Sequence, residues 1–345
     1  MNPLTMLTFT LSLLTATVVV LSSHHWLLAW IGLELNTLAI LPLMTKTPHP
    51  RAIEAATKYF LMQATASALL LFSALMNAYE TGHWDPTSMV GTPTTVLSIA
   101  LLTKLGLAPM HFWMPEVLQG TPLATGLILS TWQKIAPMCL FLQTHHSIDT
   151  SLIVLISLTS IIVGGWGGIN QTQLRKMMAF SSIGHFGWIV MVIKFNPQLA
   201  MFSFLVYITM TTAMFATLMT LLATSMMDMS TAWPKTPTLT TTAMLTLLSL
   251  AGLPPLTGFV PKLLISLELM KQNLVLLTSA TMLVSLLALF FYLRLVFIMV
   301  LTLSPNSPNS MITWHGPMKA NLLITVMTTL ALVASTLSPT IMLLM

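Results

Sequence analysis

Apolar runs of about 20 residues recur along the whole chain, and short polar breaks separate them. A run of that length, folded as an α-helix, crosses a hydrocarbon layer of roughly 30 Å. Only 6% of the residues are charged and 55% are hydrophobic, so the chain has too little polar surface to face water on all sides. The sequence therefore predicts an all-α polytopic membrane protein.

Eleven membrane spans are predicted, and the breaks between them are rich in Pro, Asn, Thr and charge. The spans cover residues 3–22, 25–44, 54–79, 94–113, 122–145, 149–169, 173–195, 197–224, 239–270, 274–302 and 320–344. The first run lacks the basic leader and cleavage site of a signal peptide, so we interpret it as a span. Because loop Lys and Arg favour the side that holds the N-terminus, we expect an inward N-terminus and an outward C-terminus.

Two interrupted hydrophobic segments share one sequence pattern. GLAPMHFWMPEV begins at Gly106, and GLPPLTGFVPKL begins 146 residues later at Gly252. Both patterns place Gly and Pro where a continuous helix cannot tolerate them. Interrupted helices at corresponding positions of two halves indicate a transport site built from internal repeats.

Four charges lie within or beside the predicted spans. Glu34, Lys104 and Lys134 are near the middle of spans, and Lys262 follows the break in the ninth. A charge at mid-membrane costs roughly 2.5–3.5 kcal/mol even on the insertion scale, so these side chains should face the bundle interior. Burial brings the proton affinities of amines and carboxylates closer together, which favours a proton relay. His111 and His185 are further candidates for the relay, because imidazole carries protons through either nitrogen.

Two other interpretations of these charges stay open. They are structural if they only form ion pairs that hold helices together, although three Lys face one Glu. Alternatively, the chain is a cation/proton antiporter that works alone. The preferred hypothesis is a proton-conducting membrane subunit, and the alternatives are the stand-alone antiporter and the scaffold.

Several kinds of chemistry are disfavoured. The lone Cys139 excludes a four-thiolate iron–sulfur or metal site supplied by this chain alone. There is no nucleotide-binding glycine pattern and no concentrated basic face for nucleic acid. The glycines of GGWGG, residues 164–168, are better explained by close helix packing in lipid. We therefore expect no cofactor and no metal on this chain, and no nucleic-acid partner.

The segments that contain these charged residues and histidines resemble segments of a known protein family. They read GLEL, TKLGLAPMHFWMPEV, STWQKIAP, NQTQLRKMMAFSSIGHFGW and LSLAGLPPLTGFVPK. Together they resemble the antiporter-like membrane subunits of respiratory complex I, the proton-translocating NADH:ubiquinone oxidoreductase. The likeness covers most of residues 25–300.

The resemblance implies two inverted five-helix repeats, each with a discontinuous helix, in residues 1–146 and 147–303. Residues 304–345 would form a loop and a C-terminal helix. Glu34, Lys104, Lys134 and Lys262 match the proton-relay positions of the family, and His111 and His185 match histidines of the same axis. The chain lacks N-terminal helices of the bacterial members, which should leave a flank for lipid or partner subunits. Phe180 stands where the second half would repeat Glu34.

The resemblance also implies where the redox chemistry lies. NADH, FMN, iron–sulfur clusters and ubiquinone are expected in other subunits of the enzyme. The expected partners are other membrane-arm subunits, including neighbouring antiporter-like and accessory subunits, together with lipids. The expected location is the mitochondrial inner membrane, with the N-terminus on the matrix side and the C-terminus on the intermembrane-space side.

Overall fold

The computed structural model describes residues 3–46, 49–86, 89, 91–233, 236–301 and 324–334. These residues are helices joined by short connections, and their only β pairing is an isolated bridge between Gln173 and Ser225. The chain divides into two compact units, unit 1 at residues 1–160 and unit 2 at residues 161–345. Each unit is described by itself.

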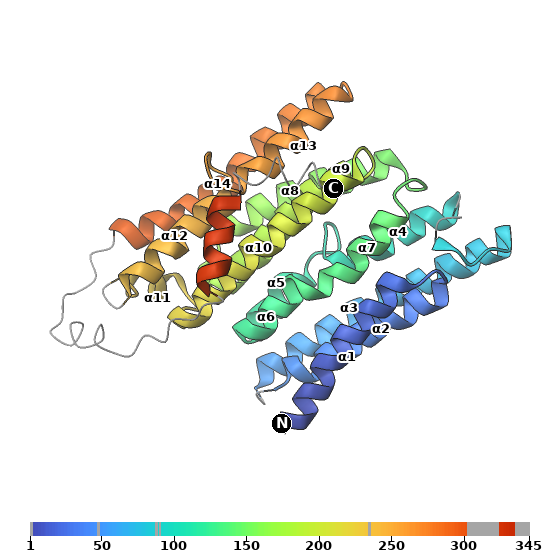
Figure 1. Ribbon diagram of the computed structural model, residues 1–345, viewed down its shortest axis with the longest axis horizontal. Helices are drawn as coiled ribbons and strands as arrows, with labels where there is room; N and C mark the ends of the chain where they lie inside the picture. The colour runs from blue at the N-terminus through green and yellow to red at the C-terminus, as the bar shows by residue number, and fades with distance from the viewer. Residues whose placement is uncertain are drawn as a thin grey trace. The chain divides into compact units, whose positions relative to one another are not determined.

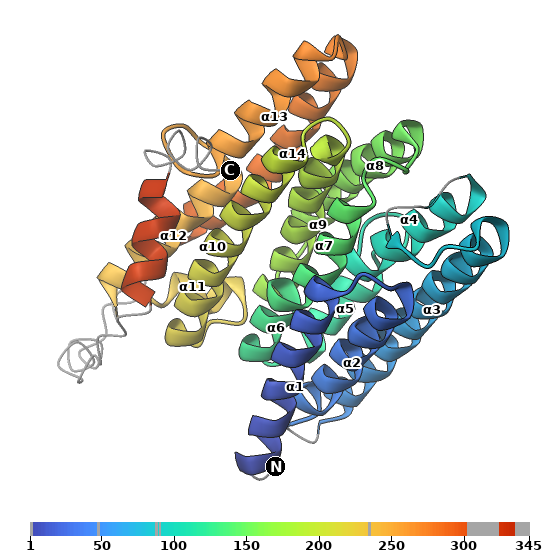
Figure 2. The ribbon, with the colours of Figure 1, turned by 45° about the vertical axis from the view of Figure 1, so that its right-hand side comes forward.

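Unit 1 is a bundle in which α3 is the central packing element. It contacts α2, α4 and α5, while α1 packs against α2 and α7 (Figures 1 and 2). Its elements are α1 (Pro3–Ser22), α2 (Trp26–Met44), α3 (Pro50–Thr81), α4 (Thr92–Leu105), α5 (Trp113–Gly120), α6 (Leu123–Ser130), the 3-10 turn η2 (Trp132–Lys134) and α7 (Ile135–Gln143). Helix α3 begins four residues before its predicted span, 54–79. The His49 side chain accepts a hydrogen bond from the Arg51 N–H, and Pro50 suits the first turn of a helix, so the helix can begin there.

Unit 2 is built around α9, α10 and α12. The helices after α7 are α8 (Thr150–Ile169), in which the chain passes from unit 1 to unit 2, α9 (Leu174–Ile193), α10 (Pro197–Leu221), α11 (Met226–Ser230), α12 (Pro237–Ala251), α13 (Phe259–Lys271), α14 (Val275–Leu301) and a helix at Ile324–Ala334. Helix α10 contacts α9, α12 and α13, and α14 contacts α11, α12 and α13. In its most apolar stretch, 78% of α9 is buried against 22% for α1, so α9 belongs to the core of its unit.

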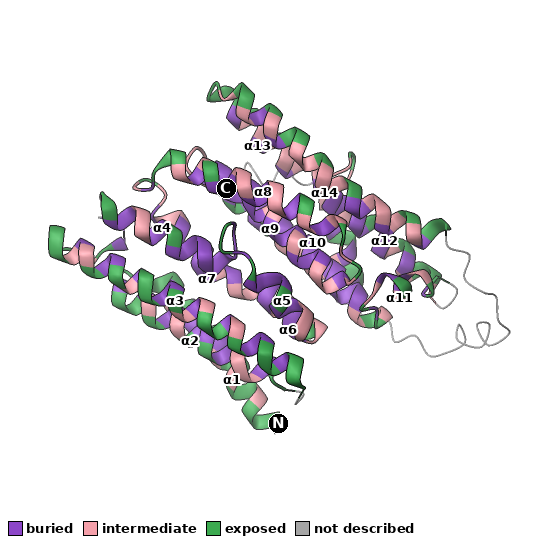
Figure 3. Cartoon of the chain, turned by 180° about the vertical axis from the view of Figure 1, so that it is seen from behind, coloured by how far each residue is buried: buried purple, intermediate pink, exposed green. Residues whose placement is uncertain are grey.

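The outer surface of the helices is apolar, as a membrane protein requires. Within the described residues, seven helices are long and apolar enough to cross a membrane. Figure 3 shows exposed residues along α1, among which Leu4, Leu7 and Leu11 are each at least half exposed. Lipid tolerates such a face, and helices satisfy their own backbone groups there. The prediction of a polytopic all-α protein is confirmed. Eleven spans stay a prediction, because the loop from residue 304 and part of the last span lie outside the described residues.

Both predicted helix breaks are present, and they share their backbone geometry. Helix α4 ends at Leu105 and is capped by Gly106, with φ 79° and ψ 38°, and α12 ends at Ala251 and is capped by Gly252, with φ 80° and ψ 40°. Only glycine adopts this left-handed conformation without steric cost. The next residue in each break, Leu107 or Leu253, donates its N–H back to a carbonyl five residues earlier. These are Schellman endings, and a cis X-Pro bond follows each of them. The discontinuous helices are therefore confirmed.

The fifth predicted span, residues 122–145, is wrong as one continuous helix. Helix α6 ends at Ser130, the 3-10 turn η2 follows, and α7 begins at Ile135. Pro137 is the physical reason, since proline has no N–H and its ring clashes with the carbonyl of residue i−4, which here is Gln133. This third interruption places Lys134 at a break. Sequence analysis also missed α11, whose Ser225 and Asp228 form a capping box.

Glycine allows α8 and α9 to approach closely, as the GGWGG segment predicts. A Cβ atom on Gly164 would lie 2.6 Å from the backbone N and 2.8 Å from the Cα of Gly184. A Cβ atom on Gly184 would meet nothing nearer than the Gly164 Cα, at 3.9 Å. Where α8 crosses α9, position 164 therefore has no room for a methyl group, whereas position 184 has room for one.

We expect Gly164→Ala to destabilise the protein by about 1–3 kcal/mol, because the two backbones must separate. Gly184→Ala is the matched control, and its effect should stay within roughly 0.5 kcal/mol. The temperature of half-aggregation in detergent extracts of the membrane measures both. Equal shifts for the two variants would contradict the close packing at Gly164.

Candidate functional site

The predicted site residues fall into two groups, one in each unit. Glu34, Lys104, His111 and Lys134 belong to unit 1. His185 and Lys262 belong to unit 2.

Lys104 and Glu34 form a buried charge pair without a direct hydrogen bond. Lys104 lies in the last turn of α4 and is 5% exposed, and Glu34 is half-buried on α2. Their charges interact, yet Lys104 Nζ and Glu34 Oε2 have no hydrogen-bond partner among the residues that the structure describes. A cation is favoured at the C-terminal end of a helix, where the carbonyls concentrate partial negative charge.

Lys134 lies at the interruption between α6 and α7 and is 2% exposed. Its neighbour Gln133 fixes this segment to two other helices. Gln133 Nε2 donates to the Tyr59 hydroxyl on α3 at 2.7 Å and to the Asn36 carbonyl on α2 at 3.1 Å. Sequence analysis did not identify Tyr59 or Gln133, although a glutamine beside a lysine in an apolar run was a signal for a polar contact.

His111 and Trp113 join the two parts of the first broken helix. His111 is 7% exposed, and its Nδ1 lies 3.1 Å from the Pro109 carbonyl. Because a carbonyl only accepts, Nδ1 carries a proton, and Nε2 of the neutral ring is left as an acceptor. Trp113 Nε1 donates to the Thr103 carbonyl at 3.2 Å. The start of α5 is thereby held to the residue before Lys104.

Lys262 occupies a different place in the second broken helix. Its Nζ donates to the carbonyl of Ala251, the last residue of α12, at 2.8 Å. A Cβ atom on Gly252 would lie 2.8 Å from this Nζ, so the glycine also makes room for the ammonium group. The corresponding place in the first break holds Glu116, which pairs with Lys58 on α3 at 2.6 Å. The two breaks share a backbone path but differ in charge.

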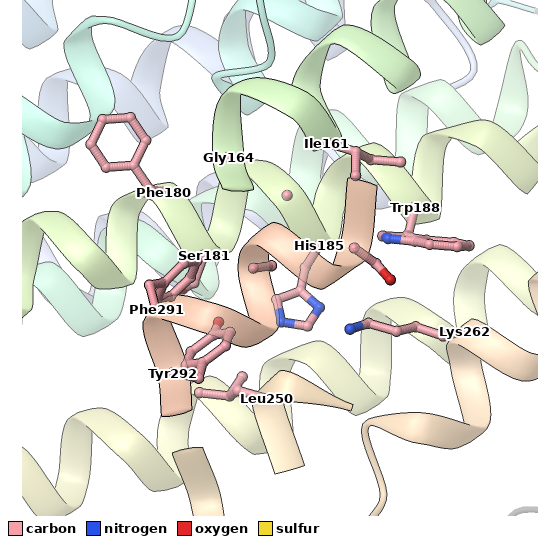
Figure 4. Close-up of a pocket in the computed structure, with 13 residues that line it drawn as sticks. Ile161, Gly164, Phe180, Ser181, His185, Trp188, Leu250, Lys262, Phe291 and Tyr292 are labelled. Carbon is pink, nitrogen blue, oxygen red and sulfur yellow. The ribbon is translucent and has the colours of Figure 1, made fainter. Parts of the chain in front are cut away.

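His185 and Lys262 face each other beside two small cavities. Figure 4 shows the Lys262 ammonium group pointing toward the His185 ring. One cavity of about 20 Å³ is lined by these two residues and by Ser181 and Tyr292. A second cavity of about 20 Å³ is lined by the same pair and by Tyr207. Each cavity has room for about one water molecule.

Arg294 is an intramembrane charge that sequence analysis missed. It lies within α14, and its Nη1 donates to the carbonyl of Ile169, the last residue of α8, at 2.7 Å. An arginine at a helix C-terminus satisfies carbonyls that have no partner in the helix. This contact explains Arg294 as a structural residue. The sequence could not reveal it, because 125 residues separate the partners.

Known proteins are similar in sequence to this chain along its whole length. Residues 23–288 match the family described as NADH:quinone oxidoreductase/Mrp antiporter, TM, and residues 289–342 match the NADH dehydrogenase subunit 2 C-terminus. An NADH-ubiquinone oxidoreductase chain 2 from Aquarana catesbeiana is 64% identical over 344 residues, which is 100% of both chains. The chain belongs to the NADH-ubiquinone oxidoreductase chain 2 family. The predicted resemblance to antiporter-like complex I subunits is confirmed.

Other members and solved structures agree with this family. The Xenopus laevis NADH-ubiquinone oxidoreductase chain 2 is 53% identical over 330 residues, covering 94% of this chain and 95% of that protein. A chain of respiratory complex I from Thermus thermophilus matches with a TM-score of 0.87 at 25% identity, over 99% of this chain and 80% of that chain. A chain of the Mrp complex from Dietzia sp. DQ12-45-1b has the same fold, with a TM-score of 0.81 at 15% identity, over 97% of this chain and 75% of that chain.

The contact between Trp113 and Thr103 can be tested in this member of the NADH-ubiquinone oxidoreductase chain 2 family. We expect Trp113→Phe to destabilise the protein by about 1–2 kcal/mol, because one hydrogen bond and part of the packed ring are lost. Trp166→Phe is the control, since that side chain is 70% exposed. The temperature of half-aggregation should fall only for Trp113→Phe. An unchanged temperature would contradict a stabilising role for this hydrogen bond.

Proposed function

We propose that this chain is an antiporter-like core subunit of proton-pumping NADH:ubiquinone oxidoreductase and conducts protons through its buried charges. The observation that carries the proposal is that Lys104 Nζ and Glu34 Oε2 are both buried within the membrane bundle and that neither has a hydrogen-bond partner among the described residues. A purely structural ion pair would be expected to close into hydrogen-bonded contact, because an uncompensated buried charge is costly. An open pair instead allows each group to exchange its proton.

In unit 1 the transfer would follow the charge of Glu34. A proton that binds Glu34 removes the negative charge that stabilises the Lys104 ammonium group, so Lys104 releases its proton more readily. The proton released by Lys104 would pass to Lys134 at the next interruption. His111 would serve as a further acceptor through Nε2, since its Nδ1 proton is held by the Pro109 carbonyl.

In unit 2 the transfer would run between Lys262 and His185. The ammonium group points toward the imidazole ring, and water-sized cavities lie beside both (Figure 4). A neutral imidazole takes a proton at one nitrogen and releases one from the other. Lys262 would return to the Ala251 carbonyl after it is protonated again, because this carbonyl stabilises the charged amine.

The redox chemistry is proposed to lie outside this chain. NADH, FMN, iron–sulfur clusters and ubiquinone would be held by other subunits, and the chain would contact other membrane-arm subunits and lipids. We further propose a mitochondrial inner-membrane location, with the N-terminus on the matrix side and the C-terminus on the intermembrane-space side. Residues 1–146 and 147–303 would form the two inverted repeats, followed by a loop and helix at 304–345. The names of the relatives and the Thermus thermophilus likeness support a place among the subunits of this oxidoreductase, and the distribution of Lys and Arg between the loops supports the orientation.

Neutralising the pair in unit 1 tests the proposed function. We expect Glu34→Gln and Lys104→Met each to reduce proton pumping by roughly tenfold or more per assembled enzyme, because a carboxamide and a thioether cannot exchange a proton at these sites. Glu80→Gln and Lys271→Met are matched controls, since both side chains are exposed. Pumping is measured as acidification of the lumen of inside-out membrane vesicles that oxidise added NADH, with quinone reduction followed in parallel.

The outcomes separate the proposal from its alternatives. A scaffold predicts normal pumping from whatever enzyme assembles with Glu34→Gln and Lys104→Met, and that result would overturn the relay. A stand-alone antiporter predicts cation/proton exchange by the reconstituted chain without other subunits. Loss of pumping with normal assembly in both variants supports the relay.

A further inference from the structure

We propose that Tyr59 and Gln133 form a positioning pair that holds Lys134 at a fixed separation from Glu34 in unit 1. The inference rests on the proposed proton relay and adds two residues to it. Neither residue carries a charge in the relay, and both are named for their contacts with segments that do.

Tyr59 is held from two sides in the interior of unit 1. Its side chain is 0% exposed on α3, and its ring packs edge-on against Trp113, with ring centroids 5.7 Å apart. Trp113 in turn donates to the Thr103 carbonyl, directly before Lys104. Tyr59 is therefore a fixed point between the segments that carry the charges.

Gln133 uses this fixed point to anchor the interruption between α6 and α7. Its Nε2 group has two hydrogens, and the structure gives them two acceptors, the Tyr59 hydroxyl at 2.7 Å and the Asn36 carbonyl at 3.1 Å. Asn36 follows Glu34 by two residues on α2, and Lys134 follows Gln133 directly. One amide group thus connects the helix of Glu34, the helix of Tyr59 and the segment of Lys134.

The anchor matters because the regular helix is interrupted here, and turn hydrogen bonds such as that from the Lys134 N–H to the Thr131 carbonyl, at 3.3 Å, replace the helical ones. Thr131 has φ −115° and ψ −70°, which departs from helical geometry, and Pro137 removes a helical hydrogen bond. The two hydrogen bonds of Gln133 therefore add to the contacts that orient this segment. Reacting groups must be held within about 0.5 Å of their productive geometry, so a loosened segment slows proton transfer.

Substitution at Tyr59 isolates the hydrogen bond from the packing. Tyr59→Phe keeps the ring against Trp113 and removes only the oxygen that accepts from Gln133. Gln133→Met removes the donor from the other side while keeping a side chain of similar size. Tyr79→Phe is the matched control on the same helix, because Tyr79 is 91% exposed.

The experiment compares these variants in mitochondrial membranes that contain the assembled oxidoreductase. We expect Tyr59→Phe to lower the pumping rate per assembled enzyme about two- to tenfold, as for the loss of one buried hydrogen bond. Gln133→Met should lower it by a similar factor, and the double variant should be no worse than the stronger single one. The pH dependence of pumping should shift as well, because the separation of the titrating groups Glu34, Lys104 and Lys134 changes. Tyr79→Phe should match the unmodified enzyme.

Two results would overturn the inference. One is a normal rate and pH profile per assembled enzyme in both Tyr59→Phe and Gln133→Met, and the other is a double variant in which the separate losses multiply. A merely structural role predicts less assembled enzyme with an unchanged pH profile, which also counts against positioning. The relay hypothesis itself is tested by Glu34→Gln, because normal pumping by that variant would contradict it. If that variant stops pumping while Tyr59→Phe does not, only the positioning pair is rejected.

Discussion

The hydrogen bonding of the backbone in lipid is the constraint on which this structure depends. A helix satisfies its own N–H and C=O groups, and any interruption leaves some of them without partners in the membrane. At Gly106 and Gly252 the chain meets this requirement with Schellman endings. Side chains supply the rest, since Trp113 donates to the Thr103 carbonyl and Lys262 to the Ala251 carbonyl.

The same constraint explains why the three buried lysines lie at interruptions. Carbonyls at the end of α4 favour the cation of Lys104, and those at the end of α12 accept directly from Lys262. At the interruption before α7, backbone turn hydrogen bonds remain, and Gln133 adds two side-chain hydrogen bonds to other helices. A break in a membrane helix thus provides the polar surroundings that a buried lysine needs. The two units use one backbone device with different charges around it.

Much of the site could be predicted from residues close together in the sequence. The breaks follow from Gly and Pro in the repeated pattern, and the buried charges follow from their places within apolar runs. The interruption before α7 was missed even though Pro137 is its local cause, because the run from residue 122 to 145 is apolar enough to read as one helix. Tyr59, Gln133 and Arg294 were missed for another reason: their partners are 74, 97 and 125 residues away.

The sequence by itself determined that the protein lies in a lipid membrane, that it is helical, where the two matching breaks fall and which charged residues lie within the spans. These properties depend on hydropathy over about 20 residues and on the local geometry of Gly and Pro. Only the tertiary structure decided which groups face one another. Glu34 lies near Lys104, Lys262 points toward His185, and Tyr59 meets Gln133 because helices distant in the chain pack side by side. Such contacts depend on which face each helix buries, and apolar residues on all sides of a membrane helix leave that choice to packing.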